Sequence, residues 1–168
     1  MTGYDDNNNY YGLVYTNDGK GNFNTSFTLY HKPGAGSVAL QDIDNDGDID
    51  LIITGETNGG FISEIYTNNG IGKFYFKTSI TPGVQESSLA FVDIDNDNDW
   101  DLIITGDTGS SSYSKIFKNK NGEFEPFADL TPWLSKSSVA AGDIDNDGDF
   151  DLIYDWFGLF WKSLYLCI

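Results

Sequence analysis

The sequence predicts an all-β protein built from a repeated unit of four short antiparallel strands. The composition supports this, because 19 glycines, 10 tyrosines and 12 phenylalanines suit short strands joined by tight turns. Three segments of the 168-residue chain also resemble one another at a spacing of about 50 residues, which is the mark of a repeat architecture. Helical periodicity is absent. With 39% hydrophobic and 15% aromatic residues, the chain is expected to fold around a core.

The repeats are anchored by three acidic loops. They begin at Asp42, Asp93 and Asp143, which lie 51 and 50 residues apart, and each loop leads into an apolar run that starts Asp-Leu-Ile. A second block, with an asparagine- and glycine-rich turn before a phenylalanine, recurs at 12–23, 63–74 and 114–124. A period near 50 with four strand-like runs per unit is typical of the blades of a β-propeller.

The first complete repeat shows the expected strands in order. Small and apolar residues predict a first strand over 37–41, and the run after the acidic loop predicts a second over 51–54. The third strand is expected over 64–67 and the fourth over 74–77. Between these two, the sequence Asn-Asn-Gly at 68–70 predicts a turn, because these residues tolerate positive φ.

Aligning the repeats divides the chain into five parts. These are a partial blade of later strands, two full repeats, a partial repeat with its first two strands and acidic loop, and a divergent apolar tail, at 2–36, 37–87, 88–137, 138–154 and 155–168. The total is about three blade equivalents, whereas closed propellers carry four to eight blades. We therefore expect a fragment of a larger propeller or, failing that, several chains that assemble.

The tail is too short to span a bilayer, and Lys162 interrupts it. Three interpretations of the tail are open. It can be a truncated or frame-shifted end, a strand packed on the last blade, or a segment for membrane docking or oligomer formation. No stretch of 18 or more apolar residues predicts a transmembrane helix.

The charge of the chain is concentrated. There are 26 acidic residues against nine lysines and no arginine, for a formal net charge of −17. This balance argues against binding to nucleic acid and to anionic membranes, since both require basic surfaces. Fifteen of the acids lie in the three loops, so the charge belongs mainly to the repeats.

Five aspartates within nine residues repel one another unless a cation lies among them. In the first loop Asp42, Asp44 and Asp46 occupy alternate positions and can point inward together, while Gly47 permits a sharp turn. The carbonyl of Asp48 and the carboxylate of Asp50 can complete the shell. Such an all-oxygen set suits Ca²⁺, matches zinc or copper poorly, and is less suited to the small hydrated shell of Mg²⁺.

Two alternatives compete with calcium loops of this kind. An EF-hand requires glutamate at loop position 12, but Ile53, Ile104 and Tyr154 stand there. The loops can also be merely solvated acidic turns, although a solvated turn does not need the same alternation in three copies. Asn98 replaces the glycine of the second loop, where asparagine still tolerates a left-handed conformation, so weaker binding is expected there.

The loop pattern Asp-x-Asp-x-Asp-Gly-x-x-Asp, followed by Leu-Ile-Ile-Thr-Gly and then by Ile-Tyr-x-Asn-Asn-Gly-x-Gly-x-Phe, resembles the FG-GAP/VCBS repeat family, which includes the integrin α-chain propeller. The resemblance covers roughly residues 2 to 154 and implies blades whose loop between the first and second strands holds a structural Ca²⁺, about three ions in all. The ligands it implies are Asp42, Asp44, Asp46, Asp48 (by its carbonyl) and Asp50; Asp93, Asp95, Asp97, Asp99 and Asp101; and Asp143, Asp145, Asp147, Asp149 and Asp151.

The sequence offers little for catalysis. His31 and Cys167 are each the only residue of their type, so neither a His/Cys zinc site nor an internal disulfide can form. No nucleophile elbow or phosphate loop is present. Glu56, Glu64 and Glu86 could pair with aspartates for glycoside hydrolysis, but the sequence does not give the separations between these carboxylates. The protein is therefore expected not to be an enzyme.

These observations favour a calcium-stabilised module for extracellular binding or cell adhesion, with a protein or carbohydrate ligand. Trp100 or Trp133 could stack on a sugar if exposed. The alternative is an accessory or structural propeller domain of a larger secreted enzyme, such as one that degrades polysaccharides. An extracellular or cell-surface location is expected because such loops work at the calcium levels found outside cells, although the first residues do not form a signal peptide.

Overall fold

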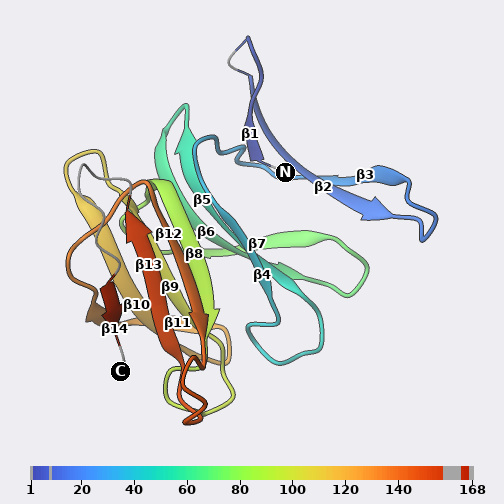
Figure 1. Ribbon diagram of the computed structural model, residues 1–168. Coiled ribbons are helices and arrows are strands. Elements are labelled where there is room, and N and C mark those ends of the chain that lie inside the picture. Colours follow the sequence, from blue (N-terminus) through green and yellow to red (C-terminus); the bar gives the residue numbers. More distant parts are fainter. Residues whose placement is uncertain (1, 8, 157–163, 167–168) are drawn as a thin grey trace.

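The computed structural model describes residues 2–7, 9–156 and 164–166. This part of the chain forms fourteen strands in four antiparallel sheets and contains no helix (Figure 1). The all-β prediction is thus confirmed, and the sheets are consistent with blades of an unclosed propeller. Much of the predicted apolar tail, including Cys167, lies outside the described residues.

The first and second sheets contain the N-terminal strands. The first sheet has the order β1-β2-β3, with β1 at Thr2–Tyr4, β2 at Tyr10–Asn17 and β3 at Phe23–Thr28. The second has the order β4-β5-β6-β7, with β4 at Val38–Gln41, β5 at Asp50–Thr57, β6 at Gly60–Asn68 and β7 at Phe74–Ser79.

The third and fourth sheets repeat this plan. The third has the order β8-β9-β10-β11, with β8 at Gln85–Val92, β9 at Asp101–Asp107, β10 at Ser112–Lys120 and β11 at Glu123–Asp129. The fourth has the order β12-β13-β14, with β12 at Ser137–Gly142, β13 at Asp151–Trp156 and β14 at Leu164–Leu166. The strand β14, which lies in the apolar tail, pairs with the final sheet. This agrees with one of the three interpretations of the tail given above.

The repeats share strand register as well as order. A β-bulge interrupts the pairing of the last two strands at the same place in three sheets, after Val14, Ile65 and Ile116. A bulge re-aims the residues that follow it and raises local twist. Its recurrence shows that the sequence repeat is also a repeat of backbone geometry, so residues at aligned positions can be compared as counterparts.

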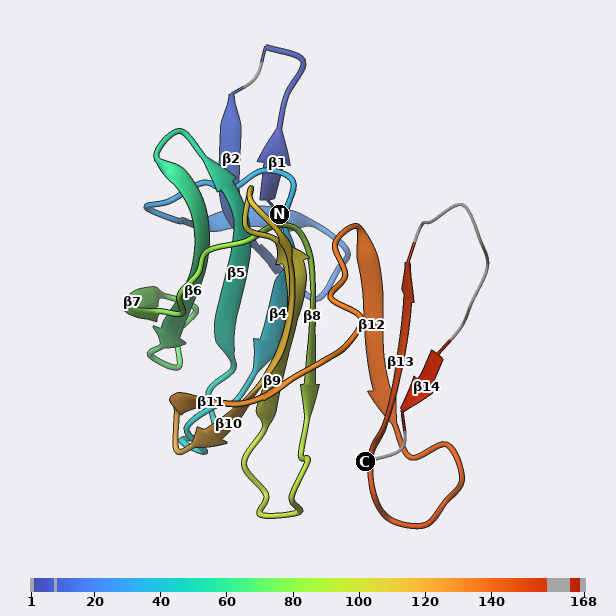
Figure 2. The ribbon, with the colours of Figure 1, turned by 90° about the vertical axis from the view of Figure 1, so that its left-hand side faces the viewer.

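The sheets stack face to face in chain order, with an apolar cluster between each neighbouring pair (Figures 1 and 2). The inner strand β5 contributes side chains to the apolar clusters on both faces of the second sheet. Leu51 and Ile53 pack toward the first sheet, whereas Ile52 packs toward the third. In β9 the same alternation places Ile103 in the cluster shared with the fourth sheet. Burial on both faces explains why these strands read as continuous apolar runs.

The first and fourth sheets lie at the two ends of this stack. The first sheet covers the outer face of the second, and the fourth covers the outer face of the third. Among the described residues, no helix is long and apolar enough to cross a membrane.

Candidate metal centres

The three acidic loops occupy equivalent places. Each joins the first and second strands of a sheet, between β4 and β5, β8 and β9, and β12 and β13, and all three lie at the same end of the stack (Figure 2). The expected link between strands, rather than between helices, is confirmed. Gly47 has φ 92° and Asn98 has φ 69°, so the left-handed conformation expected at this loop position is present with either residue.

In every loop, three carboxylates converge. One oxygen from each lies within 4.8 Å of the other two in the triads Asp42, Asp44 and Asp50; Asp93, Asp95 and Asp101; and Asp143, Asp145 and Asp151. Carboxylate oxygens at this spacing are the donor type that Ca²⁺ takes. Each of the three triads could therefore hold a metal ion, and the first loop is described below as the example.

The first aspartate of each loop also shapes the backbone. Asp42 accepts hydrogen bonds from the backbone N–H groups of Asp46 and Gly47, at 3.2 and 3.0 Å. Asp46 in turn accepts one from the N–H of Asp48 at 2.8 Å. Asp46 and Asp48, with their counterparts in the other loops, lie outside the triads, so their part in coordination remains a prediction.

The last aspartate is the buried member of the first triad. Asp50 accepts hydrogen bonds from the N–H of Ile43 at 3.2 Å and from the N–H of Asn68 at 2.8 Å, so the loop is tied to both β5 and the end of β6. Asp101 has the same two partners in the third sheet, Ile94 at 3.0 Å and Asn119 at 2.7 Å. These hydrogen bonds hold the carboxylate of the last aspartate in place, at the start of a buried strand and next to the loop.

The electrostatics of the triads are those of crowded carboxylates. Burial, followed by neighbouring acids, raises the pKa of Asp50 and Asp101 above 3.8. Repulsion from Asp147 raises the pKa of Asp145. In the first loop Asp44 Oδ1 is buried without a hydrogen-bond partner among the described residues. A buried carboxylate oxygen without a donor is costly, and a cation would offset that cost.

The second loop contains its own cation. Lys118 Nζ lies 2.6 Å from Asp95 Oδ2 and 4.4 Å from the centre of the Phe127 ring. The counterpart of Lys118 in β6 is Thr67, so the first loop has no such lysine. The two loops therefore differ in how they compensate the same acidic triad.

The loops are joined by asparagines that the sequence analysis did not single out. The Asn45 side-chain amide donates to Asp99 at 2.6 Å, and that of Asn96 donates to Asp149 at 3.0 Å. Both asparagines have positive φ, 58° and 55°. An asparagine between the second and third aspartates of every loop is the signal that could have revealed them. These bonds link each loop to the loop of the next sheet.

His31 contacts a buried glutamate of the second sheet. Its Nδ1 lies 2.7 Å from Glu64 Oε1, and Glu64 is buried at 3% exposure. The Tyr66 hydroxyl donates to the other Glu64 oxygen at 2.7 Å. This group ties the segment before β4 to the second sheet and already occupies Glu64, one of the three glutamates considered for catalysis.

A polar hollow of about 840 Å³ lies beside His31. Its lining includes Tyr10, Tyr11 and Tyr30, together with Thr57 at the end of β5 and Asn58 in the turn that follows. Tyr30 is 85% exposed. Aromatic rings with hydroxyl groups can both stack and donate hydrogen bonds.

The two tryptophans considered for sugar binding differ. Trp133 is 57% exposed, as stacking on a ligand would require. Trp100 instead makes an edge contact with Phe150 of the next acidic loop, with ring centroids 6.4 Å apart. It therefore belongs to the packing between the third and fourth sheets.

Comparison with known protein families gives a match to a repeat family. The model of an FG-GAP-like repeat matches residues 42–104 and again residues 93–154. Each match starts at the first aspartate of an acidic loop and extends through the next loop into the strand that follows it. Together they span more than half of the chain. No curated protein matches the sequence.

Proposed function

Because the chain belongs to the FG-GAP-like repeat family, we propose that it is a calcium-binding module of β-propeller type that acts outside the cell in binding or adhesion. Calcium has a structural part in this proposal. The protein itself carries out no reaction, and its ligand is a protein or a carbohydrate.

The calcium proposal rests on Asp44 Oδ1 in the first triad, which is buried and has no hydrogen-bond partner in the described part of the chain. A hydrated turn would leave such an oxygen in water, whereas a cation site needs it inside. Asp42, Asp44 and Asp50 would hold the ion, with further oxygens from Asp46 and the Asp48 carbonyl. Bound Ca²⁺ would supply positive charge between β4 and β5 and thereby relieve the repulsion among the carboxylates.

The tyrosine-lined hollow supports the ligand-binding part of the proposal. Its exposed ring of Tyr30 and the polar groups of His31, Lys32 and Asn58 offer both a stacking surface and hydrogen-bonding groups. Carbohydrates combine apolar ring faces with many hydroxyls, so a lining of this kind favours a glycan. The extracellular location fits the weak calcium affinity of extracellular modules.

Calcium titration tests the metal proposal. Calorimetric titration of chelator-treated protein should give saturable binding, and the thermal unfolding temperature should rise with millimolar Ca²⁺. At a free concentration one hundred times the dissociation constant, one site adds about 2.7 kcal/mol to the free energy of unfolding. Asp44→Ala should remove one site. Glu125→Gln, an exposed change outside the loops, should leave the stoichiometry unaltered. No binding heat and no thermal shift would refute the proposal.

A glycan array probed with the labelled chain tests the ligand. Tyr30→Ala should abolish any binding that uses the hollow, while Tyr75→Ala, at another exposed tyrosine on β7, should preserve it. Binding that survives Tyr30→Ala would place the ligand elsewhere. The accessory-domain alternative predicts instead that the isolated chain binds no glycan and that a catalytic domain is encoded beside it.

A further inference from the structure

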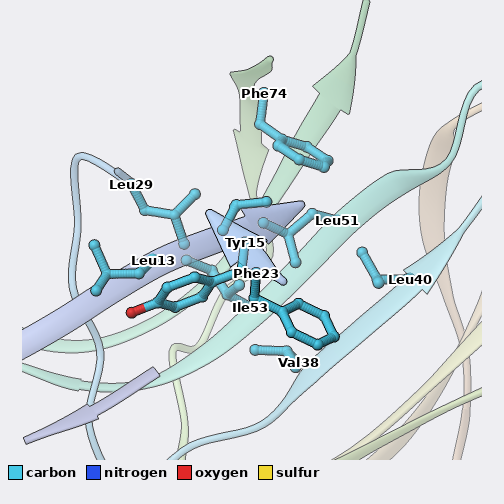
Figure 3. Close-up of a pocket in the computed structure, with 10 residues that line it drawn as sticks. Leu13, Tyr15, Phe23, Leu29, Val38, Leu40, Leu51, Ile53 and Phe74 are labelled. Carbon is cyan, nitrogen blue, oxygen red and sulfur yellow. The ribbon is translucent and has the colours of Figure 1, made fainter. Parts of the chain in front are cut away.

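An apolar groove of about 520 Å³ opens between the first and second sheets (Figure 3). Val38 and Leu40 of β4 line it and are 46% and 58% exposed. Their counterparts in the third sheet are Leu89 and Phe91, which pack in the apolar cluster against the second sheet. The groove therefore marks a place where one layer of blade-to-blade packing is missing.

The missing layer is the inner half of a blade. The first sheet has counterparts of the outer strands, and β1 pairs only with the far end of β2, from Tyr10 to Gly12. In the second sheet, the strand β5 continues along β6 as far as Tyr66. The inner two strands of a blade would thus lie beside β2 and over Val38 and Leu40.

The fourth sheet provides the inner strands that the first sheet lacks. Its strands β12 and β13 pair in the register of β4 and β5 and carry an acidic loop. On its outer face, Ile153 is 42% exposed, whereas its counterparts Ile52 and Ile103 are fully buried against the following sheet. Ile144 is likewise 50% exposed, while its counterpart Ile43 is 1% exposed. In the part of the chain that the structure describes, no further sheet follows on this face.

Two polar groups, one in the first acidic loop and one in the last, are unmatched in the same way. Asn45 and Asn96 each bridge to an aspartate of the next sheet. Their counterpart Asn146 has the same positive φ, 60°. Among the described residues, no such bridge is formed by the Asn146 amide or received by the Asp48 carboxylate, although Asp48 is the counterpart of the two acceptors. The last acidic loop thus holds an unmatched donor and the first acidic loop an unmatched acceptor.

The buried aspartates repeat this complementarity. Asp50 and Asp101 each accept a hydrogen bond from the backbone N–H of an asparagine at the end of the third strand, Asn68 or Asn119. In the described part of the chain, Asp151 accepts only from Ile144. The counterpart of Asn68 and Asn119 that remains is Asn17, which ends β2 in the first sheet.

We propose that two copies of this chain join head to tail, so that β12 and β13 of each copy complete the first sheet of the other. Ile144 and Ile153 would then cover Val38 and Leu40 in the groove. Asn146 would donate to Asp48, and Asn17 would donate to Asp151. Each chain contributes about three blades, so two copies make six, within the range of closed propellers.

A single chain cannot make these contacts with itself, because the first and fourth sheets lie at opposite ends of the stack (Figure 1). In the single chain, β14 pairs with β13 through Leu152–Leu166 and Ile153–Tyr165. This is the register in which β6 pairs with β5. Joining therefore exchanges β14 for β2 of the second copy, as in domain swapping.

Light scattering coupled to gel filtration tests the stoichiometry. The 18.6 kDa chain should elute as a dimer that dissociates on dilution. Val38→Asp places a charge in the groove at a residue already half exposed in the single chain, and should weaken dimerisation on the order of 10- to 100-fold. Tyr75→Asp is the matched control, since Tyr75 is 56% exposed on the outer strand β7, and it should leave the dimer intact.

A monomer at millimolar concentration, a trimer or an open-ended polymer would overturn the proposal, as would equal effects of the two variants. Thermal unfolding of each variant at low concentration shows whether the single chain is folded, so that misfolding is not mistaken for dissociation.

Disulfide trapping tests the arrangement of the two copies. In a Cys167→Ser background, Asp48→Cys with Asn146→Cys should give a covalent dimer under mild oxidation, because these loops would meet across both junctions. Tyr75→Cys with Asn146→Cys should give none. A dimer that traps equally with both pairs would show that the copies associate through another surface.

Discussion

The buried Oδ1 oxygen of Asp44 determines whether a substitution at this residue raises or lowers the free energy of unfolding. In the metal-free protein, Asp44→Asn should stabilise the fold, because it removes one of three converging charges and its amide can donate a hydrogen bond. In saturating Ca²⁺ it should be destabilising by about 2 kcal/mol or more, because one binding site is lost. Urea unfolding with chelator and with Ca²⁺ measures both. The same sign under both conditions would argue against a cation at this triad.

The buried carboxyls of Asp50 and Asp101 predict an unusual dependence on pH. Because the pKa of each is raised above 3.8 in the fold, the folded metal-free protein binds these protons more tightly than the unfolded chain. Their contribution to the free energy of unfolding should therefore increase as pH falls from 7 into the range just above 3.8. With Ca²⁺ present the trend should reverse, since acid displaces the cation.

Chemical unfolding between pH 7 and pH 4, with chelator and with Ca²⁺, measures these trends. Asp50→Asn serves as the control, because it removes one of the titrating groups and should reduce the increase seen without metal. An unchanged profile in that variant would assign the pH dependence to other acids.

At the level of single elements, the acidic loop depends on a backbone conformation that glycine favours. Gly47 has φ 92°, and a Cβ built there meets no atom within 4 Å. Gly47→Ala should therefore cost about 1–2 kcal/mol through conformational strain alone. Gly47→Asn should cost less, because Asn98 already takes φ 69° at the same position.

Gly142→Ala, at the end of β12, provides the matched control for Gly47→Ala. A Cβ at Gly142 also meets nothing within 4 Å, but this glycine does not have positive φ. Its substitution should change the free energy of unfolding by less than about 0.5 kcal/mol. Thermal or urea unfolding compares the three variants. Equal costs for Gly47→Ala and Gly142→Ala would mean that the loop does not require the left-handed conformation.

The strands and loops were predictable from sequence because they follow local rules. The apolar run and the repeat placed the second strand after Asp50. The aspartate spacing brought Asp42 and Asp44 together as expected, whereas the third carboxylate of the triad is that of Asp50 and not that of Asp46. Contacts between distant segments do not follow from local rules, although the asparagine repeated in every loop was a signal for one kind of bridge. The bridge from Asn45 to Asp99, the buried Glu64 beside His31 and the lysine at Asp95 each join residues more than 20 positions apart.

For the whole molecule, burial predicts an order of local stability. Strands β5 and β9 are buried on both faces, with Ile52 and Ile103 fully inaccessible. By contrast, β3 in the first sheet is mostly exposed. Amide hydrogen exchange should therefore be slowest in β5, β6, β9 and β10, and faster by at least about tenfold in β3 and, in the dissociated single chain, in β2. Mass spectrometry of exchanged peptides measures this, and uniform protection across all four sheets would contradict it.

The asparagine bridges between loops also bear on how calcium would fill the three sites. Asn45 holds Asp99 of the second loop, and Asn96 holds Asp149 of the third. An ion that orders one loop thereby fixes a donor that its neighbour uses, so the next ion meets a loop that has already lost part of its freedom. The row of loops would then respond to calcium as one cooperative unit, with a Hill coefficient above one that Asn45→Ala and Asn96→Ala return toward one.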